Sequence, residues 1–167
     1  MTPFRLLFLC THNSARSILS EGVARAIAPD EIEAYSAGSN PRGSVHPEAL
    51  AALTRAGLTT DGLTSKSWDV FAGKDAPTID LVITVCDAAA QETCPYFSGA
   101  PLTVNWGVPD PSAAPETEQA ARFDATLARL KARIDALTEL KPHTLDRETL
   151  KREALAIAAA DADPAGV

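Results

Sequence analysis

Near its N-terminus the chain passes from a short apolar run through a polar loop into a helical pattern. The apolar run Leu6–Leu9 lies within a segment, about Phe4 to Leu9, that is typical of a buried strand. Apolar residues then recur at helical spacing between about Ala15 and Ala28. We therefore expect the intervening loop to be a strand-to-helix turn, in which backbone N–H groups and the helix N-terminus converge on one point and bind a tetrahedral oxyanion.

This loop begins with Cys10, and Arg16 follows after five residues. A guanidinium offers paired donors to two oxygens of a bound oxyanion, and the same positive field is expected to lower the pKa of the thiol. A thiolate beneath a bound oxyanion is a nucleophile aimed at its central atom. A lone cysteine is more often a small buried hydrophobe, and for the bare pair that interpretation is favoured. The strand, the helix and the small polar loop residues favour the anion site instead; these residues are Thr11, Asn13, Ser14 and Ser17.

The size and charge of the chain limit its function classes. A chain of 167 residues, of which 46% are hydrophobic, is expected to form one domain with a packed core. The net charge of −7 argues against a general binder of nucleic acid or of membrane surfaces. The first ten residues contain too short an apolar run for a secretory signal, and no segment of the sequence approaches the apolar length of a membrane span, so we expect a soluble cytoplasmic protein. Three cysteines without a disulfide framework then indicate reactive or structural thiols.

Strand and helix patterns alternate along the chain, which predicts an α/β fold with a parallel sheet between helices. We expect residues 1–141 to form the main unit, and residues 142–167 to add a helix and a tail to the same domain. Ligands bind such sheets beyond the carboxyl ends of the strands, where Cys10, Cys86 and the loop around Asp110 all lie. The expected strands are 4–9, 32–36, 80–85 and 102–105; the expected helices are 15–28, 47–56, 116–140 and 145–159, with a helical turn at 67–71.

Cys86 follows the strongest strand pattern, and Cys94 follows eight positions later in CDAAAQETCP. These cysteines could form a redox pair with Cys10; the alternatives are that both are structural or that they supply half of a zinc site. Zinc requires four ligands and the histidines are scattered, so we predict no metal site. A redox pair is more attractive, because Cys86 would attack an adduct on Cys10 and Cys94 would carry the disulfide outward by thiol–disulfide exchange. The segment between them must then move.

Asp110 stands between two prolines after the last strand. The stiff backbone suits a proton donor above an anion site, and the alternative is an ordinary exposed turn aspartate. Within the anion loop, His12 is expected to lie at the mouth of the site.

A looser hypothesis groups Asn13, Glu21, Ser36 and Lys66 behind the anion loop, with Lys66 as the cation that a buried Glu21 would require. The alternative is that Glu21 and Lys66 are exposed and unrelated, and the sequence alone favours it.

The motifs CTHNSARS, YSAG, VCDAAAQETCP and NWGVPDP resemble those of arsenate reductases built on the low-molecular-weight tyrosine phosphatase fold. The resemblance covers about Phe4 to Leu140 and implies a three-layer, flavodoxin-related fold with a four-stranded parallel sheet. It implies that Cys10 attacks arsenate, that Ser17 hydrogen-bonds the thiolate, and that Asp110 protonates the leaving oxygen. The implied oxyanion-binding residues are Thr11, His12, Asn13, Ser14, Ala15 and Arg16.

The resemblance also implies that Cys86 attacks Cys10 and releases arsenite, and that a Cys86–Cys94 disulfide then forms. An external thiol system, thioredoxin or glutathione/glutaredoxin, would reduce this disulfide without a bound cofactor, and phosphate or sulfate would compete with arsenate. In some relatives potassium binds behind the loop at positions that include Asn13, Glu21 and Ser36. Lys66 stands where those relatives have an aspartate, so we expect its ammonium to replace the ion and activity not to depend on potassium.

Three departures from the family pattern bear on the reductant rather than on the chemistry. The segment between Cys86 and Cys94 is one residue longer than in thioredoxin-coupled members, Ala15 replaces a cysteine, and His12 replaces a glycine.

Two other functions start from the same loop: a protein-tyrosine phosphatase and a non-catalytic oxyanion binder. The later cysteines favour reduction, as does the absence of an aromatic residue between Asn40 and Glu48, where phosphatases often place one. A binder would tolerate Cys10→Ser.

Overall fold

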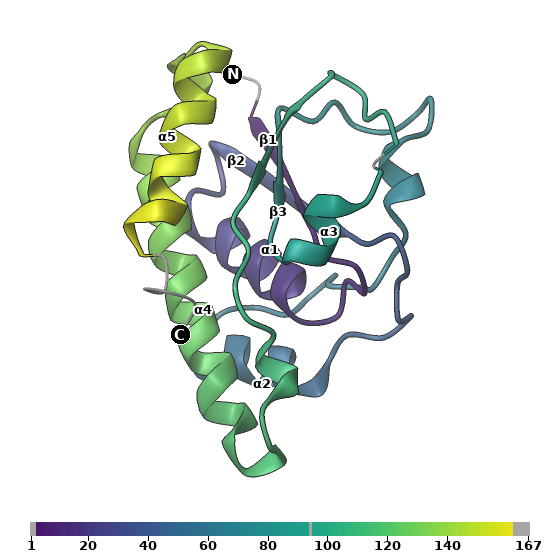
Figure 1. The fold of residues 1–167 in the computed structure, drawn as a ribbon, viewed down its shortest axis with the longest axis vertical. Helices are drawn as coiled ribbons and strands as arrows, with labels where there is room; N and C mark the ends of the chain where they lie inside the picture. The colour runs from purple at the N-terminus through teal and green to yellow at the C-terminus, as the bar shows by residue number, and fades with distance from the viewer. Residues whose placement is uncertain (1–2, 94, 162–167) are drawn as a thin grey trace.

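A computed structural model describes residues 3–93 and 95–161 as an α/β fold around a parallel sheet (Figure 1). The sheet has the strand order β2-β1-β3-β4, and each neighbouring pair is parallel. The register pairs Leu6 of β1 with Ala34 on one side and with Leu81 on the other. The predicted four-stranded parallel sheet is therefore confirmed. Its strands are β1 (Phe4–Leu9), β2 (Ile32–Ala37), β3 (Leu81–Thr84) and β4 (Leu102–Asn105).

The helices lie close to their predicted positions, and the ends differ by one or two residues. The segment after Cys86, which is not among the predicted elements, forms a short helix. The α-helices are α1 (Arg16–Ile27), α2 (Pro47–Arg55), α3 (Asp87–Gln91), α4 (Glu116–Glu139) and α5 (Arg147–Ala160). The 3₁₀ turns are η1 (Trp68–Phe71), η2 (Pro111–Ala113) and η3 (Pro142–Thr144).

The central strands are buried on both faces, which explains their continuous apolar runs. Leu6 and Phe8 point into a large core against α1, α4 and α5. Leu7 and Leu9 point into a second, smaller core on the other face, with Phe71 of η1. Side chains alternate between the faces along β1 as its pleat requires.

The C-terminal helix α5 packs on α4 and β4 (Figure 1). Trp106 is buried after β4 and donates a hydrogen bond from Nε1 to the carbonyl of Ala154, at 2.8 Å. Arg133 of α4 donates to the carbonyl of Trp106 at 2.6 Å and forms an ion pair with Asp161. These contacts connect α5 to the segment that leads to Asp110.

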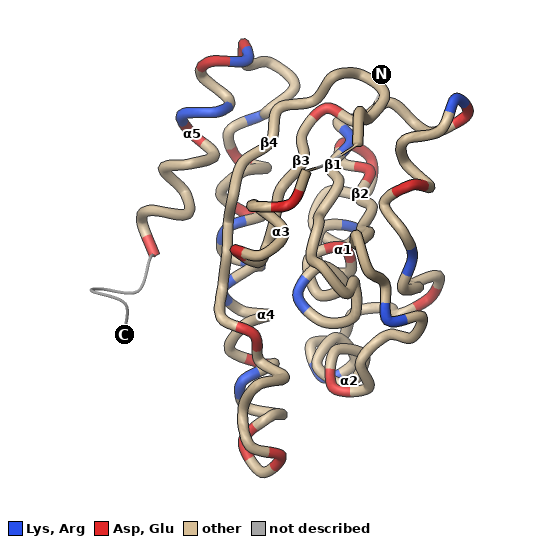
Figure 2. Tube along the Cα trace, turned by 45° about the vertical axis from the view of Figure 1, so that its right-hand side comes forward, with Lys and Arg blue, Asp and Glu red and all other residues tan. Residues whose placement is uncertain are grey.

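Both signs of charge are interspersed along α4 and α5 (Figure 2). Among residues 3–93 and 95–161, none of the helices combines the length and the apolar composition that crossing a bilayer requires.

Candidate active site

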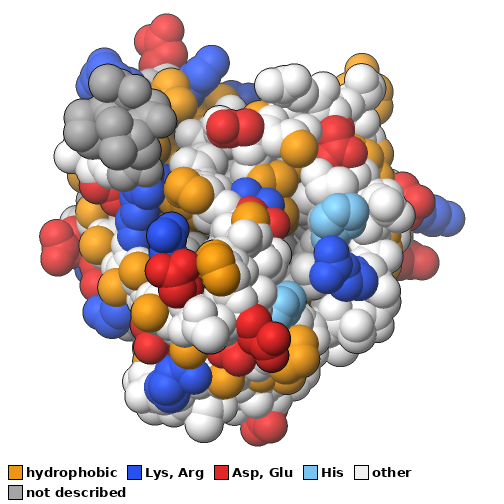
Figure 3. All heavy atoms as spheres, turned by 60° about the horizontal axis from the view of Figure 1, so that its bottom comes forward, with side chains coloured by type: hydrophobic (Ala, Val, Ile, Leu, Met, Phe, Trp, Pro, Cys, Tyr) orange, Lys and Arg blue, Asp and Glu red, His pale blue; other side chains and the backbone are white. Residues whose placement is uncertain are grey.

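Three segments meet at the carboxyl edge of the sheet, as the strand order predicts. Cys10 follows β1, Cys86 follows β3, and the loop with Asp110 follows β4. On this end of the molecule, charged side chains of both signs and histidines lie scattered among uncharged ones (Figure 3). The parallel topology thus brings together groups that are far apart in sequence.

The loop between β1 and α1 turns sharply at Asn13, which has a φ of 44°. This left-handed conformation is one that asparagine tolerates better than most residues. The loop also lies tightly against Gly38, where an added Cβ would approach the carbonyl oxygens of Cys10 and Thr11 to 2.4 Å each. A glycine after β2 is therefore required for the loop to take this path.

Cys10 and Cys86 are both buried, are both free thiols, and form a hydrogen bond with each other. Cys86 is the N-cap of α3, and its sulfur accepts a hydrogen bond from the N–H of Ala89 at 3.4 Å. The hydroxyl oxygen of Thr11 lies 3.9 Å from the same sulfur. Two sequence-predicted thiols are thus in contact beside the anion loop.

The pKa of the Cys10 thiol is raised here, whereas the positive field of the loop and of Arg16 predicts a lowered one. Its hydrogen bond to Cys86, together with burial, raises the pKa of the Cys10 thiol, and Arg16 opposes this only in part. The same hydrogen bond lowers the pKa of Cys86 to about 5 in spite of burial. The two thiols therefore titrate as a coupled pair that shares one proton across the hydrogen bond, and transfer of this proton places the negative charge on one sulfur or on the other.

Arg16 extends from the first turn of α1 toward the Asp110 loop. Its Nη1 donates to the carbonyl of Val108 at 2.9 Å, and its Nη2 lies 3.8 Å from Oδ2 of Asp110. Within the described part of the chain, the buried Nε of Arg16 has no hydrogen-bond partner. Since buried donors are nearly always paired, this N–H marks a place for an acceptor such as an oxyanion oxygen.

Asp110 caps η2, where its Oδ1 accepts hydrogen bonds from the backbone N–H and the hydroxyl of Ser112, at 2.9 and 2.7 Å. Partial burial raises its pKa, but the Ser112 hydrogen bonds and the positive charges of Arg16 and Arg42 lower it more. Asp110 is thus an exposed residue that caps a turn and lies beside Arg16, and its role as a proton donor stays a prediction.

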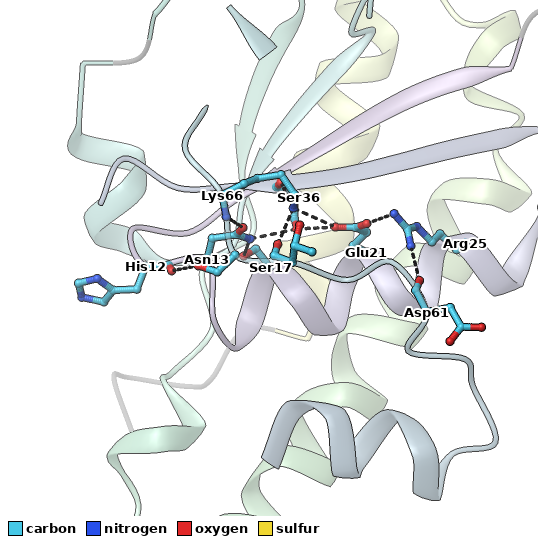
Figure 4. Close-up of polar contacts among 10 residues, drawn as sticks. His12, Asn13, Ser17, Glu21, Arg25, Ser36, Asp61 and Lys66 are labelled. Carbon is cyan, nitrogen blue, oxygen red and sulfur yellow. Dashed lines mark hydrogen bonds and ion pairs between the residues drawn. The ribbon is translucent and has the colours of Figure 1, made fainter. Parts of the chain in front are cut away.

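The predicted polar cluster behind the loop does assemble (Figure 4). The side-chain nitrogen of Asn13 donates to the hydroxyls of Ser17 and Ser36, at 2.8 and 3.0 Å, and its oxygen accepts from the backbone N–H of Lys66 at 2.8 Å. The hydroxyl of Ser36 donates to Glu21 at 2.5 Å. The strained residue of the loop is thus held by a hydrogen-bond network that reaches β2 and α1.

Glu21 is 1% exposed and pairs with two cations. Lys66 Nζ lies 3.9 Å from its Oε1, and Arg25 forms an ion pair with its Oε2. Burial raises the pKa of Glu21, although Ser36, Lys66 and Arg25 lower it, and burial lowers the pKa of Lys66. Lys66 also donates to the carbonyls of Ser36 and Thr64, at 2.9 and 2.6 Å. The interpretation of Glu21 and Lys66 as exposed and unrelated is therefore wrong.

Two residues near the site were not anticipated. Arg25 pairs with Glu21 from the next turn of α1, and the only sequence signal is their spacing of four residues. Glu92, which follows α3, accepts a hydrogen bond from the hydroxyl of Thr11 at 2.9 Å and another from Ser39. Its only signal is its position as the sole glutamate between the two later cysteines.

The remaining predicted residues take various positions. Ser14 and Ala15 are buried in the loop, and the exposed His12 ring contacts the carbonyl of Asn40 at 3.1 Å. Ser17 is buried beside Asn13, and among the described residues its hydroxyl makes no hydrogen bond with Cys10. Cys94 lies outside the described residues.

A cavity of about 670 Å³ opens beside Cys86 and Arg16. It reaches from Arg16 and Cys86, past the backbone of Gly107, to Arg129 and Arg133 of α4. Both of these arginines pair with Asp161, so this side of the cavity is closed by contacts that hold α5.

Comparison with known proteins agrees with this geometry. Residues 5–154 match the low molecular weight phosphotyrosine protein phosphatase family. The chain belongs to this family. An arsenate reductase of Bacillus subtilis (strain 168) is 36% identical over 114 residues, which are 68% of this chain and 78% of that protein. An arsenate reductase of Staphylococcus aureus (strain Newman) is 34% identical over 118 residues, 71% of this chain and 86% of that protein.

Solved structures of the family share the fold. One, described as an arsenate reductase in the phosphate binding state, has a TM-score of 0.67 at 25% identity and covers 82% of this chain and 98% of its own. Another, a low molecular weight protein tyrosine phosphatase from T. tengcongensis, has a TM-score of 0.64 at 24% identity and covers 82% and 99%. The second likeness concerns the fold alone.

Proposed function

We propose that this chain is an arsenate reductase that converts arsenate to arsenite with Cys10 as the nucleophile. The observation that carries the proposal is the contact between two free thiols, Cys10 and Cys86, beside an anion loop. A hydrolase needs one thiol there, whereas reduction needs a second thiol within reach of the first. The relatives named arsenate reductases support the same activity.

In the first step arsenate binds to the N–H groups of the loop from Thr11 to Ala15 and to Arg16, whose unpaired Nε suits an oxyanion oxygen. Phosphate and sulfate share this geometry and compete. The shared proton moves to Cys86, and the Cys10 thiolate attacks arsenic. A sulfur–arsenic bond forms and one arsenic–oxygen bond breaks. Asp110, after taking up a proton, supplies it to the leaving oxygen, which departs as water.

In the second step Cys86 releases to water the proton that it took up in the first step, and the resulting thiolate attacks the sulfur of Cys10. The sulfur–sulfur bond forms and the sulfur–arsenic bond breaks, so its electron pair stays on arsenic, which leaves as arsenite. Two thiols are oxidised and arsenic gains two electrons. The contact between the sulfurs, the N–H of Ala89 and the hydroxyl of Thr11 suit Cys86 to this attack.

In the third step Cys94 attacks Cys86, Cys10 leaves as a thiolate, and a Cys86–Cys94 disulfide forms. An external dithiol, thioredoxin or glutaredoxin, then reduces this disulfide. All electrons come from thiols, so we propose no bound cofactor or metal. Reactive thiols must be kept reduced, and we therefore place the protein in the cytoplasm.

Thiol trapping after single turnover tests the sequence. The reduced protein is mixed with arsenate and quenched with an alkylating agent, and its disulfides are mapped by mass spectrometry. We expect arsenite together with a Cys86–Cys94 disulfide. Cys94→Ser should release one equivalent of arsenite and stop with Cys10 joined to Cys86. Multiple turnovers by Cys94→Ser would show the sequence to be wrong.

Phosphate-ester hydrolysis is the second candidate, since Arg16 and Asp110 lie together and the family is named for that reaction. Turnover of an aryl phosphate by Cys86→Ser, with no arsenite from the unmodified protein, would favour it. Full function of Cys10→Ser would instead indicate an oxyanion binder.

A further inference from the structure

Glu92 joins the segment between the two later cysteines to two other loops. Its Oε1 accepts a hydrogen bond from the hydroxyl of Thr11, at 2.9 Å, and its Oε2 accepts one from the hydroxyl of Ser39. Thr11 is the first residue after Cys10, and Ser39 follows β2. The flanking residues Gln91 and Thr93 are exposed, whereas Glu92 is half-buried.

The position of this carboxylate conflicts with anion binding. The hydroxyl of Thr11 donates a hydrogen bond to Glu92, and its oxygen lies 3.9 Å from the sulfur of Cys86. Only this hydroxyl group therefore bridges the carboxylate of Glu92 and the sulfur of Cys86. A bound oxyanion brings a second negative charge to the same loop, and like charges at this range repel in a partly buried site. Binding of an oxyanion therefore weakens the hydrogen bond between Thr11 and Glu92, and this hydrogen bond in turn weakens oxyanion binding.

We infer that Glu92 is a latch that an incoming oxyanion displaces. With the loop empty, Glu92 holds residues 87–93 against Thr11 and Ser39. When a tetrahedral oxyanion enters, the carboxylate leaves Thr11 and the segment is released. Glu92 is thus a positioning residue that couples occupancy of the loop to motion of the segment after Cys86.

The consequence for the reaction rests on the proposed function. Cys94 lies two residues after Glu92 and must reach Cys86 in the third step. A latch that opens only when an oxyanion is bound would delay this movement until substrate is present, and would limit formation of the Cys86–Cys94 disulfide in the resting protein. The latch itself requires only that the loop binds a tetrahedral oxyanion, so inorganic phosphate is a sufficient probe.

Hydrogen exchange of the reduced protein, with and without phosphate, tests the latch. In the unmodified protein we expect phosphate to increase amide exchange in residues 87–93. In Glu92→Ala these amides should exchange rapidly at once, and phosphate should no longer increase the rate. Ser39→Ala, which removes the hydrogen bond from Ser39 to Glu92 and keeps the one from Thr11, should be intermediate. Unchanged or slower exchange in the unmodified protein on adding phosphate would overturn the latch.

Phosphate affinity gives a second readout. Loss of a merely structural contact would not make phosphate bind more tightly, whereas loss of a competing negative charge would. Glu92→Gln keeps the shape and removes the charge, so phosphate should bind about fivefold more tightly at low ionic strength, and less so at high salt. Glu148→Gln removes an exposed charge on α5 and should leave the affinity unchanged. Equal or weaker binding by Glu92→Gln would refute the inference.

The outcomes separate the latch from the proposed function. Failure of either readout, while arsenate is still reduced, overturns the latch alone. Success of both, without arsenite formation, overturns the reductase and keeps the latch. A protein that binds no phosphate at all overturns both.

Discussion

The ammonium nitrogen of Lys66 lies 3.9 Å from Oε1 of the buried Glu21 and donates to two backbone carbonyls, those of Ser36 and Thr64. A carboxylate and two carbonyls are ligands that suit an alkali cation, and here an ammonium group occupies their centre. We expect activity to be the same in potassium and in sodium buffers at equal ionic strength. A strong rise in activity with potassium over sodium would contradict this role for Lys66.

Lys66→Asp reverses the charge at this position and returns an oxygen ligand. We expect this variant to be destabilised in sodium buffer and to recover stability and activity on adding potassium. Lys66→Met should lower the unfolding free energy by about 1–3 kcal/mol, because the buried Glu21 loses one of its two cations. The loss stays moderate because Arg25 still pairs with Glu21, and potassium should not restore the stability. Denaturant titration in both buffers measures the effect. Equal responses of the two variants would contradict the argument.

The ion pair between Arg133 and Asp161 is expected to anchor α5. Arg133 is 2% exposed, and its Nε donates to the carboxylate at 2.9 and 3.0 Å. Asp161→Asn should lower the unfolding free energy by about 1–3 kcal/mol at pH 7, since a buried guanidinium loses its charged partner. Asp135→Asn, which breaks an exposed pair with Lys131, should cost about 0.5 kcal/mol or less.

The pH dependence of this loss has a defined sign. Partial burial raises the pKa of Asp161, but Arg133 and Arg129 lower it more, so its pKa in the folded protein lies below that in the unfolded chain. The stability that it contributes is present above the unfolded pKa of about 3.9 and is lost as the pH falls through the folded pKa. The difference between Asp161→Asn and the unmodified protein should therefore shrink from pH 7 toward pH 3. A constant difference would rule out the ionic origin.

Local patterns were sufficient to predict the elements and the edge where the site forms. An apolar run rich in β-branched residues, such as Leu81–Thr84, indicates a buried strand, and alternation with helices indicates a parallel sheet. Parallel strands bring their carboxyl ends to one edge, which is why Cys10, Cys86 and Asp110 could be grouped from sequence alone. Their grouping depends on topology, and topology follows from the order of the elements.

Contacts that depend on side-chain direction could not be predicted in the same way. Glu92 meets Thr11 across 81 positions, and no periodic pattern encodes that distance. The positive field of the loop, the helix N-terminus and Arg16 predicts a lowered pKa for Cys10. The hydrogen bond with Cys86, which only the folded chain shows, is the largest cause that raises this pKa instead.

Gly38 should be among the least replaceable residues near the loop. An added Cβ would lie 2.4 Å from the carbonyl oxygens of Cys10 and Thr11, which are backbone atoms that cannot turn aside. Gly38→Ala should lower the unfolding free energy by about 1–3 kcal/mol and weaken phosphate binding, because the loop must shift. Gly73→Ala meets nothing within 4 Å and serves as the control. Calorimetric titration with phosphate measures the binding, and unchanged affinity in Gly38→Ala would contradict the tight fit.

The shared proton between Cys10 and Cys86 leads to the last prediction. In a Cys94→Ser background only these two thiols remain, and thiolate absorbance near 240 nm should show one ionisation with a pKa of about 5, that of Cys86. Replacing Cys86 with alanine removes this ionisation. The substitution also removes the hydrogen bond that raises the pKa of Cys10. The pKa of Cys10 should therefore fall, because the positive charge of Arg16 still lowers it. Iodoacetamide should therefore label Cys10 faster at pH 7 in the Cys86→Ala variant than in the background protein.

The matched control for this experiment is Arg16→Lys in the same background. It keeps a positive charge near Cys10 but loses the forked donor, and it leaves the contact between the two sulfurs in place. Its low-pH ionisation should therefore persist, whereas Cys86→Ala abolishes it. Slower labelling of Cys10 in Cys86→Ala would mean that the Cys86 thiolate activates Cys10 rather than holding its proton. The first step of the proposed reaction would then need a different proton acceptor.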